Sequence, residues 1–216
     1  MKLSAEEIQA NYEQFVKILQ SVTEGDRLEK VMAMLEDIGE TMALAPASGK
    51  TWYHGAYPGG YLVHVLNVAK ASVKVMKVFD SLGGNLDFTQ EELVFAALFH
   101  DLGKVCGDNG KPTYVPQESE WHRKNQGSVY INNPELDFML VPDRSLYLLQ
   151  KYGINLSQKE YLAIKLHDGL YEETNKPYLI SFNPDSKLKT NIVTVLHAAD
   201  HLAATAELDH ERQQDD

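Results

Sequence analysis

The stretch VFAALFHDLGKVCG, residues 94–107, decides what kind of fold this chain can form. Val94 to Phe99 is apolar on every side of a helix, and a helix of that kind belongs in a protein interior. It ends in His100 and Asp101, two ionisable groups that water solvates far better than a protein core does. A fold that buries this helix must therefore also give these two side chains a partner.

The sequence pattern around this stretch is helical along nearly the whole chain. Apolar residues at three- and four-residue spacing predict a helix that starts after Ser4 and further helices over 26–44, 61–79, 90–99, 119–131, 143–152, 157–167 and 187–208. Ser4 with Glu7, and Thr89 with Glu92, fit capping boxes at two of these helix starts. Glycine and proline predict loops over 45–60 and 171–186, a short hairpin is predicted around 113–115, and 209–216 is predicted to fray. We expect one all-α domain over residues 1–216.

Composition limits the functions that this domain can have. With 216 residues, 44% apolar and 24% charged, the chain can bury one substantial core. The formal net charge of −11 leaves no basic stripe for a long nucleic acid. A single cysteine, Cys106, excludes an internal disulfide, and the longest apolar run, Leu93 to Phe99, is too short to span a bilayer. We expect a cytoplasmic protein, away from membranes, with a small substrate that meets positive charge from bound metal ions.

Six ionisable side chains lie on, or at the end of, otherwise apolar helix faces: His64, His100, Asp101, His122, His167 and Asp200. A single histidine in such a place is most often a core residue bonded to a backbone carbonyl. An aspartate there is harder to explain, because burying an unpaired carboxylate costs several kcal/mol. A divalent metal ion supplies the missing compensation, and helix C-termini, where three of the six lie, also favour a cation. A nitrogen and oxygen ligand set without thiolate is typical of Mn, Fe, Co, Ni or Zn.

These residues resemble the signature of the HD phosphohydrolase superfamily. The signature has a helical histidine, a His-Asp pair about 35 residues later and a distant aspartate, which here are His64, His100-Asp101 and Asp200. HDLGK (100–104) is similar to HD-GYP phosphodiesterases and HD-type 3′-to-5′ exoribonucleases, although HDGLY (167–171) lacks the Gly-Tyr-Pro of the former. GGYLVHVLNVA (59–69) resembles the opening of the exoribonuclease and relaxase-associated types, and HAADHLAA (197–204) the late helix. The resemblance covers 52–206 and implies an HD-type helical bundle, on which helices within 1–45 would pack.

The resemblance implies a dinuclear site. One ion would be held by His64, His100, Asp101 and Asp200, and a second by His122 and His167, with Asp101 bridging the two. Both would be divalent ions from the set Mn, Fe, Co, Ni, Zn and Mg, with Mn or Fe favoured. Asp101 and Lys104 would be the catalytic residues, with Lys104 meeting the charge of the phosphoryl group. No serine or cysteine nucleophile is required.

The sequence leaves the substrate and the reaction partly open. His54, Tyr57, Arg123 and Lys124 flank the proposed ligands, where they would bind the phosphate or the base or else be surface residues. The function that we expect is hydrolysis of a phosphoester, monoester or diester, in a nucleotide or short oligonucleotide. Two alternatives are a 3′-5′ nuclease that trims single strands and a nucleotide-sensing HD module without catalysis. The oligomeric state stays open.

Overall fold

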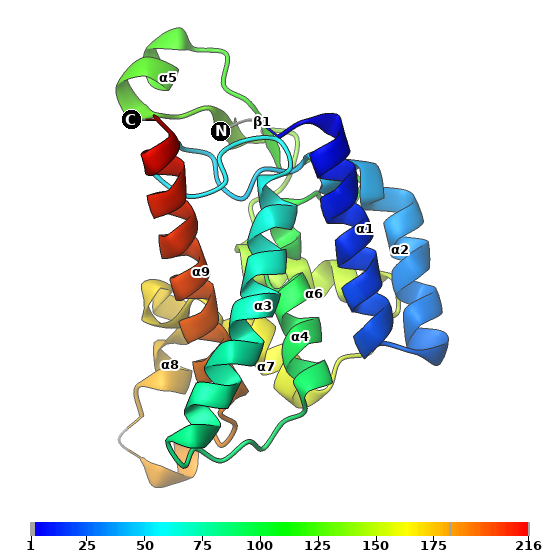
Figure 1. Ribbon diagram of the computed structural model, residues 1–216, viewed down its shortest axis with the longest axis vertical. Coiled ribbons are helices and arrows are strands. Elements are labelled where there is room, and N and C mark those ends of the chain that lie inside the picture. Colours follow the sequence, from blue (N-terminus) through cyan, green and yellow to red (C-terminus); the bar gives the residue numbers. More distant parts are fainter. Residues whose placement is uncertain (1–2, 182, 216) are drawn as a thin grey trace.

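The computed structural model describes residues 3–181 and 183–215 as a helical bundle with a small sheet at one end (Figure 1). This confirms the all-α class. The helices are α1 (Ala5–Val22), α2 (Gly25–Leu44), α3 (Gly60–Ser81), α4 (Gln90–Phe99), α5 (Glu120–Gln126), α6 (Val141–Lys151), α7 (Gln158–Leu166), α8 (Lys176–Leu179) and α9 (Ile192–Asp215). Short 3₁₀ turns lie at Leu102–Lys104, Gly169–Tyr171, Glu173–Asn175 and Pro184–Ser186, and the strands are β1 (Tyr114–Pro116) and β2 (Tyr130–Asn132).

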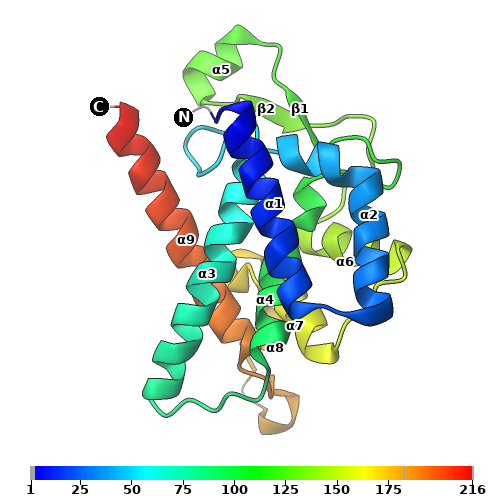
Figure 2. The same ribbon diagram turned by 45° about the vertical axis from the view of Figure 1, so that its right-hand side comes forward.

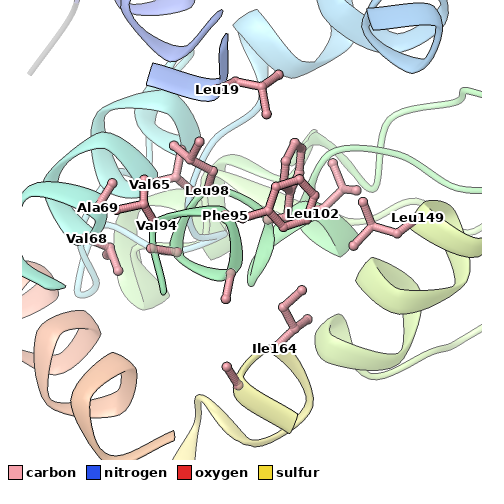
Figure 3. Close-up of a cluster of buried hydrophobic side chains, with 14 of the residues drawn as sticks. Leu19, Val65, Val68, Ala69, Val94, Phe95, Leu98, Leu102, Leu149 and Ile164 are labelled. Carbon is pink, nitrogen blue, oxygen red and sulfur yellow. The ribbon is translucent and has the colours of Figure 1, made fainter. Parts of the chain in front are cut away.

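The apolar helix α4 is the centre of the bundle. It contacts α1, α3, α7 and α9, and every residue from Leu93 to Phe99 is buried. Figure 3 shows its side chains, among them Phe95 and Leu98, in one cluster with residues of α3, α6 and α7. Neighbours on all sides explain why this helix has no polar face.

The two N-terminal helices cover one side of the bundle, and α9 runs along another (Figure 2). Helix α1 packs on α3 and α4, and α2 packs on α1 and α3. Phe15 and Leu19 of α1 are fully buried by this packing. The division into a core over 52–206 and an N-terminal pair of helices stays a prediction. In the described part of the chain, no helix combines the length and the hydropathy that crossing a membrane requires.

The structure differs from the expected elements between residues 113 and 132. The helix predicted over 119–131 ends at Gln126, because Gly127 takes a left-handed conformation (φ 58°) that ends the helix. The chain then enters β2, which pairs antiparallel with β1 so that Tyr114 faces Asn132. The predicted local hairpin around 113–115 is therefore wrong. The strand there finds its partner after α5 instead.

The last helix also differs from the prediction. It begins at Ile192 rather than near 187 and continues to Asp215, so most of the segment expected to fray is helical; residue 216 lies outside the described part. One contact that holds this end is the hydrogen bond from the Gly55 backbone N–H to Glu211 Oε1, 2.8 Å long. The predicted loop over 171–186 contains α8 and two of the 3₁₀ turns.

Candidate metal centre

Four helices bring ionisable side chains to one place inside the bundle. His64 lies in the second turn of α3, and Asp200 lies in the third turn of α9. Helix α4 ends at His100 and helix α7 ends at His167. Asp101 directly follows His100. His64, His100, Asp101 and His167 are each at most 2% exposed. Capping boxes at Thr89 and Ser157 fix where α4 and α7 begin, and the two histidines lie at the opposite, C-terminal ends of these helices.

The segment around His100 is held tightly against α6. Ser145 Oγ donates a hydrogen bond to the His100 carbonyl (2.9 Å) and accepts one from the Gly103 N–H (2.8 Å). A side chain at Gly103 would collide with the Val141 carbonyl oxygen of α6. This close approach explains why glycine occupies the fourth position of HDLGK.

The three buried histidines are oriented in the same way. In each of them Nδ1 has a hydrogen-bond acceptor that lies outside the space between the three rings. The lone pair of the ring is therefore on Nε2, which faces that space. The acceptors are Glu207 Oε2 for His64 (3.0 Å), the Ala97 carbonyl for His100 (2.8 Å) and the Ile164 carbonyl for His167 (2.8 Å).

The three Nε2 atoms face two carboxylates. His64 Nε2 lies 3.5 Å from Asp101 Oδ2 and 3.1 Å from Asp200 Oδ1. His100 Nε2 lies 3.5 and 3.7 Å from the same two oxygens, and His167 Nε2 lies 3.5 Å from Asp101 Oδ1. Metal–ligand bonds of about 2.1 Å place neighbouring ligands about 3.0 Å apart in an octahedron and about 3.4 Å apart in a tetrahedron. The spacing of these atoms is therefore that of a metal-ligand set.

The atoms in this space need a cation between them. Ionised carboxylates only accept hydrogen bonds, and so does the free nitrogen of a neutral imidazole. His100 Nε2 is buried and has no hydrogen-bond partner among the described residues. Imidazole and carboxylate suit divalent first-row metals, so the cluster can hold a metal ion.

Without a metal ion, protons are the cations that this space attracts. Burial opposes a charged imidazole, but Asp200 and Glu207 outweigh burial and raise the pKa of His64 to about 10. Burial is likewise outweighed at His167, where Asp168 and Asp101 raise the pKa to about 9. The pKa of Asp200 falls well below its usual range, because His100 and His64 outweigh the effect of burial. A divalent ion would replace these protons.

Lys104 is the one lysine in contact with the cluster among the described residues. Its Nζ lies 2.6 Å from Asp101 Oδ2, and its side chain is 18% exposed. Burial alone would raise the pKa of Asp101, but Lys104 and His100 hold that pKa well below its usual range. The amine therefore adds positive charge at the edge of the site.

Two histidines and a glutamate extend the cluster. Glu207, which the sequence analysis missed, contacts His64, and His54 Nε2 lies 4.0 Å from Glu207 Oε2. His54 Nε2 is buried and has no hydrogen-bond partner within the described part of the chain. Burial, with the charge of His64, lowers the pKa of His54 to about 4. His197 Nδ1 donates to the His167 carbonyl over 2.7 Å. A signal for Glu207 exists in the sequence, since it follows Asp200 by seven residues on one helix face.

The remaining predicted site residues lie apart from this cluster or at its border. His122 Nδ1 contacts Ser119 Oγ (2.8 Å) on α5, and His122 belongs to none of the possible metal-binding groups among the described residues. Arg123 and Lys124 are exposed on the same helix. Tyr57 is buried near Glu207, and burial raises its pKa, with a contribution from that carboxylate. The structure thus brings together five of the six predicted ligands, and the role of each stays a prediction.

Comparison with known proteins adds no relative. No family model, no curated protein and no solved structure matches the chain.

Proposed function

We propose that this chain is a metal-dependent phosphohydrolase of the HD type, which hydrolyses a phosphoester of a nucleotide or short oligonucleotide. The observation that carries the proposal is the convergence of three Nε2 atoms and two carboxylates, 3.1 to 3.7 Å apart, in the bundle interior. The order of these ligands along the chain, with HDLGK at 100–104, supports the HD assignment.

The residues around the site have chemical roles that fit this reaction. His64, His100, Asp101 and Asp200 would hold a divalent ion, which would supply Lewis-acid chemistry for the hydrolysis of a phosphoester. Lys104 is partly exposed beside Asp101 and offers its ammonium to the charge that develops on the phosphoryl group. His54 lies on the other side of His64, with its buried Nε2 4.0 Å from Glu207 Oε2, and its role in substrate binding stays a prediction.

The proposed number of ions is two, and Asp101 supports it. Its Oδ2 faces His64 and His100, whereas its Oδ1 faces His167, so its two oxygens would be available to two different ions. His122, the expected further ligand of the second ion, lies on α5 and contacts Ser119. Manganese or iron is the favoured metal in this proposal because of the mixed nitrogen and oxygen ligands.

We further propose that exposed aromatic side chains near α5 contact the base of the substrate. We define the aromatic rim as Trp52, Tyr53 and Trp121, whose exposed fractions are 57, 58 and 59%. Trp52 lies against Gly127 at the end of α5, and Lys50 Nζ lies 5.8 Å from its ring centroid. Exposed rings next to a cation are typical of surfaces on which bases stack while the cation meets a phosphate.

The proposal is tested by a substrate screen. Protein stripped with EDTA and reloaded with Mn²⁺ is assayed against mononucleotides, cyclic dinucleotides and short single strands labelled at either end. We expect hydrolysis that EDTA abolishes and Mn²⁺ restores. Shortening of single strands from the 3′ end would favour the nuclease, and nucleotide binding without any hydrolysis would reject the enzyme in favour of the sensor.

The role of the aromatic rim has its own test. Trp52→Ala and Trp121→Ala should each raise KM for the best substrate about 5- to 100-fold with kcat little changed, because base stacking contributes about 1 to 3 kcal/mol. Phe138→Ala is the matched control, since Phe138 is 81% exposed and lies outside the rim. An unchanged KM in both tryptophan variants would reject the rim as a substrate surface.

A further inference from the structure

Glu207 occupies a position behind the metal centre that the proposed function does not use. It lies on α9, seven residues after Asp200, and its side chain is 9% exposed. The His64 ring sits between these two carboxylates, with Nε2 3.1 Å from Asp200 Oδ1 and Nδ1 3.0 Å from Glu207 Oε2. One imidazole thus connects the shared space to a second carboxylate of the same helix.

Both oxygens of Glu207 have donors on α3. His64 Nδ1 donates to Oε2, and Asn67 Nδ2 donates to Oε1 over 2.8 Å. His64 and Asn67 are three residues apart and therefore lie on the same face of α3. Two donors on neighbouring turns fix both the place and the rotation of the carboxylate.

A carboxylate in this place determines which nitrogen of His64 carries the proton. An ionised carboxylate only accepts hydrogen bonds, so the ring nitrogen that faces it must be the N–H. The lone pair is then on Nε2, which faces Asp101 and Asp200. His100 and His167 reach the same orientation with backbone carbonyls, whereas His64 needs a side chain because it lies near the start of its helix rather than at the end.

We propose that Glu207 is a positioning residue of the metal centre, which holds His64 by its Nδ1–H so that Nε2 is directed at the ion. The inference rests on the proposed metal-binding function. Partners of this kind fix the orientation of a ligating imidazole and increase its basicity, and their loss typically lowers metal affinity about 10- to 100-fold.

His54, His64 and Glu207 could alternatively hold an ion of their own. The distances favour the positioning role, since His64 Nδ1 and Glu207 Oε2 are at hydrogen-bond distance and Asn67 occupies the other oxygen. His54 Nε2 is farther away, 4.0 Å from Glu207. An ion at this place would make Glu207 a ligand, and the number of bound ions separates the two cases.

The test compares Glu207→Ala and Glu207→Gln with Asp209→Ala, which removes an exposed carboxylate from the same helix. Zinc affinity is measured by competition with a chelator, and the His64 ring nitrogens are observed by NMR in the zinc-loaded protein. We expect Glu207→Ala to bind zinc about 10- to 100-fold more weakly and to lose the protected Nδ1 proton of His64. Glu207→Gln should recover most of the affinity, because its amide oxygen still accepts that proton.

Asn67→Ala provides a second, milder variant for the case that Glu207→Ala does not fold. It should weaken zinc binding a few-fold alone and add nothing to Glu207→Ala, because both act through the same hydrogen bonds. A zinc affinity of Glu207→Ala within about twofold of that of Asp209→Ala would overturn this inference and leave the proposed function untouched. Loss of one whole equivalent of metal in Glu207→Ala would overturn it in favour of a direct ligand. A wild-type protein that binds no divalent ion would instead reject the proposed function.

Discussion

Asp101 contacts four other side chains of the proposed site. Lys104 Nζ, His64 Nε2 and His100 Nε2 lie 2.6, 3.5 and 3.5 Å from its Oδ2, and His167 Nε2 lies 3.5 Å from its Oδ1. The backbone that follows Asp101 is held in place, because the Gly103 N–H donates a hydrogen bond to Ser145 Oγ of α6. A change here affects all four of these side chains directly.

Asp101→Asn should remove metal binding and turnover together. The amide keeps the shape of the side chain but loses the charge and turns an NH₂ group toward the imidazoles or Lys104. We expect at least a 100-fold weaker metal affinity, measured by metal analysis after gel filtration, and about a 1,000-fold lower kcat. Asp209→Asn, an exposed change on α9, serves as the control. Normal turnover in Asp101→Asn would reject Asp101 as a ligand.

The sequence alone allowed us to predict which ionisable residues lie on apolar helix faces. His64, His100, Asp101, His167 and Asp200 each interrupt an apolar pattern, and they converge in the structure. His122 was assigned by the same reasoning on a helix over 119–131. Because α5 ends at Gln126 and buries none of its residues, His122 lies outside the cluster, and its role as a ligand stays a prediction. Glu207 was missed because it lies close to a segment that was expected to fray.

Helices α4 and α7 are built alike, and this similarity positions two of the histidines. Each begins with a capping box and ends at a buried histidine whose ring donates to a carbonyl one turn earlier. These helices are short, 10 and 9 residues, so packing supplies most of their stability and each cap adds about 1 kcal/mol. Helix starts of this kind could be predicted from sequence, whereas the pairing of β1 with β2 could not, because its partners lie on either side of α5.

Thr89→Ala should lower the free energy of unfolding by about 1 kcal/mol, because the Glu92 N–H loses its side-chain acceptor. Thr205→Ala, within α9, is the control, since its hydroxyl only donates to the His201 carbonyl of the preceding turn. Urea unfolding measures both. We expect metal affinity to stay at the wild-type value in both variants, and a selective loss of metal affinity in Thr89→Ala would contradict the separation of capping from ligand placement.

The whole molecule carries a formal net charge of −11. Some of its carboxylates are gathered in the interior, at the proposed metal centre, and there they need positive charge beside them. In the metal-free protein the cations are protons on the histidines. The pKa of His64 is raised from its usual 6.5 to about 10, and that of His167 from 6.5 to about 9. The metal-loaded protein needs the same imidazoles neutral. Stability and metal content are therefore linked through pH.

The metal-free protein should become less stable as pH rises. Because the folded pKa values exceed 6.5, the stabilisation by these two groups is fully present below pH 6.5 and is lost as pH rises through about 9 and 10. We expect the urea midpoint of EDTA-treated protein to fall steadily between pH 6.5 and 9. Zinc-loaded protein, measured in parallel, should lose less over this range. A midpoint of the EDTA-treated protein that is constant or rises would contradict the assigned charges.

The most direct test of the metal centre is anomalous diffraction from crystals grown with Mn²⁺, recorded at the manganese edge. We predict a peak between α3, α4, α7 and α9, at bonding distance from Nε2 of His64 and His100 and from oxygens of Asp101 and Asp200, with His64 Nδ1 still on Glu207. A map with no peak at this place under saturating manganese, or imidazoles that bind an ion through Nδ1, would contradict the account.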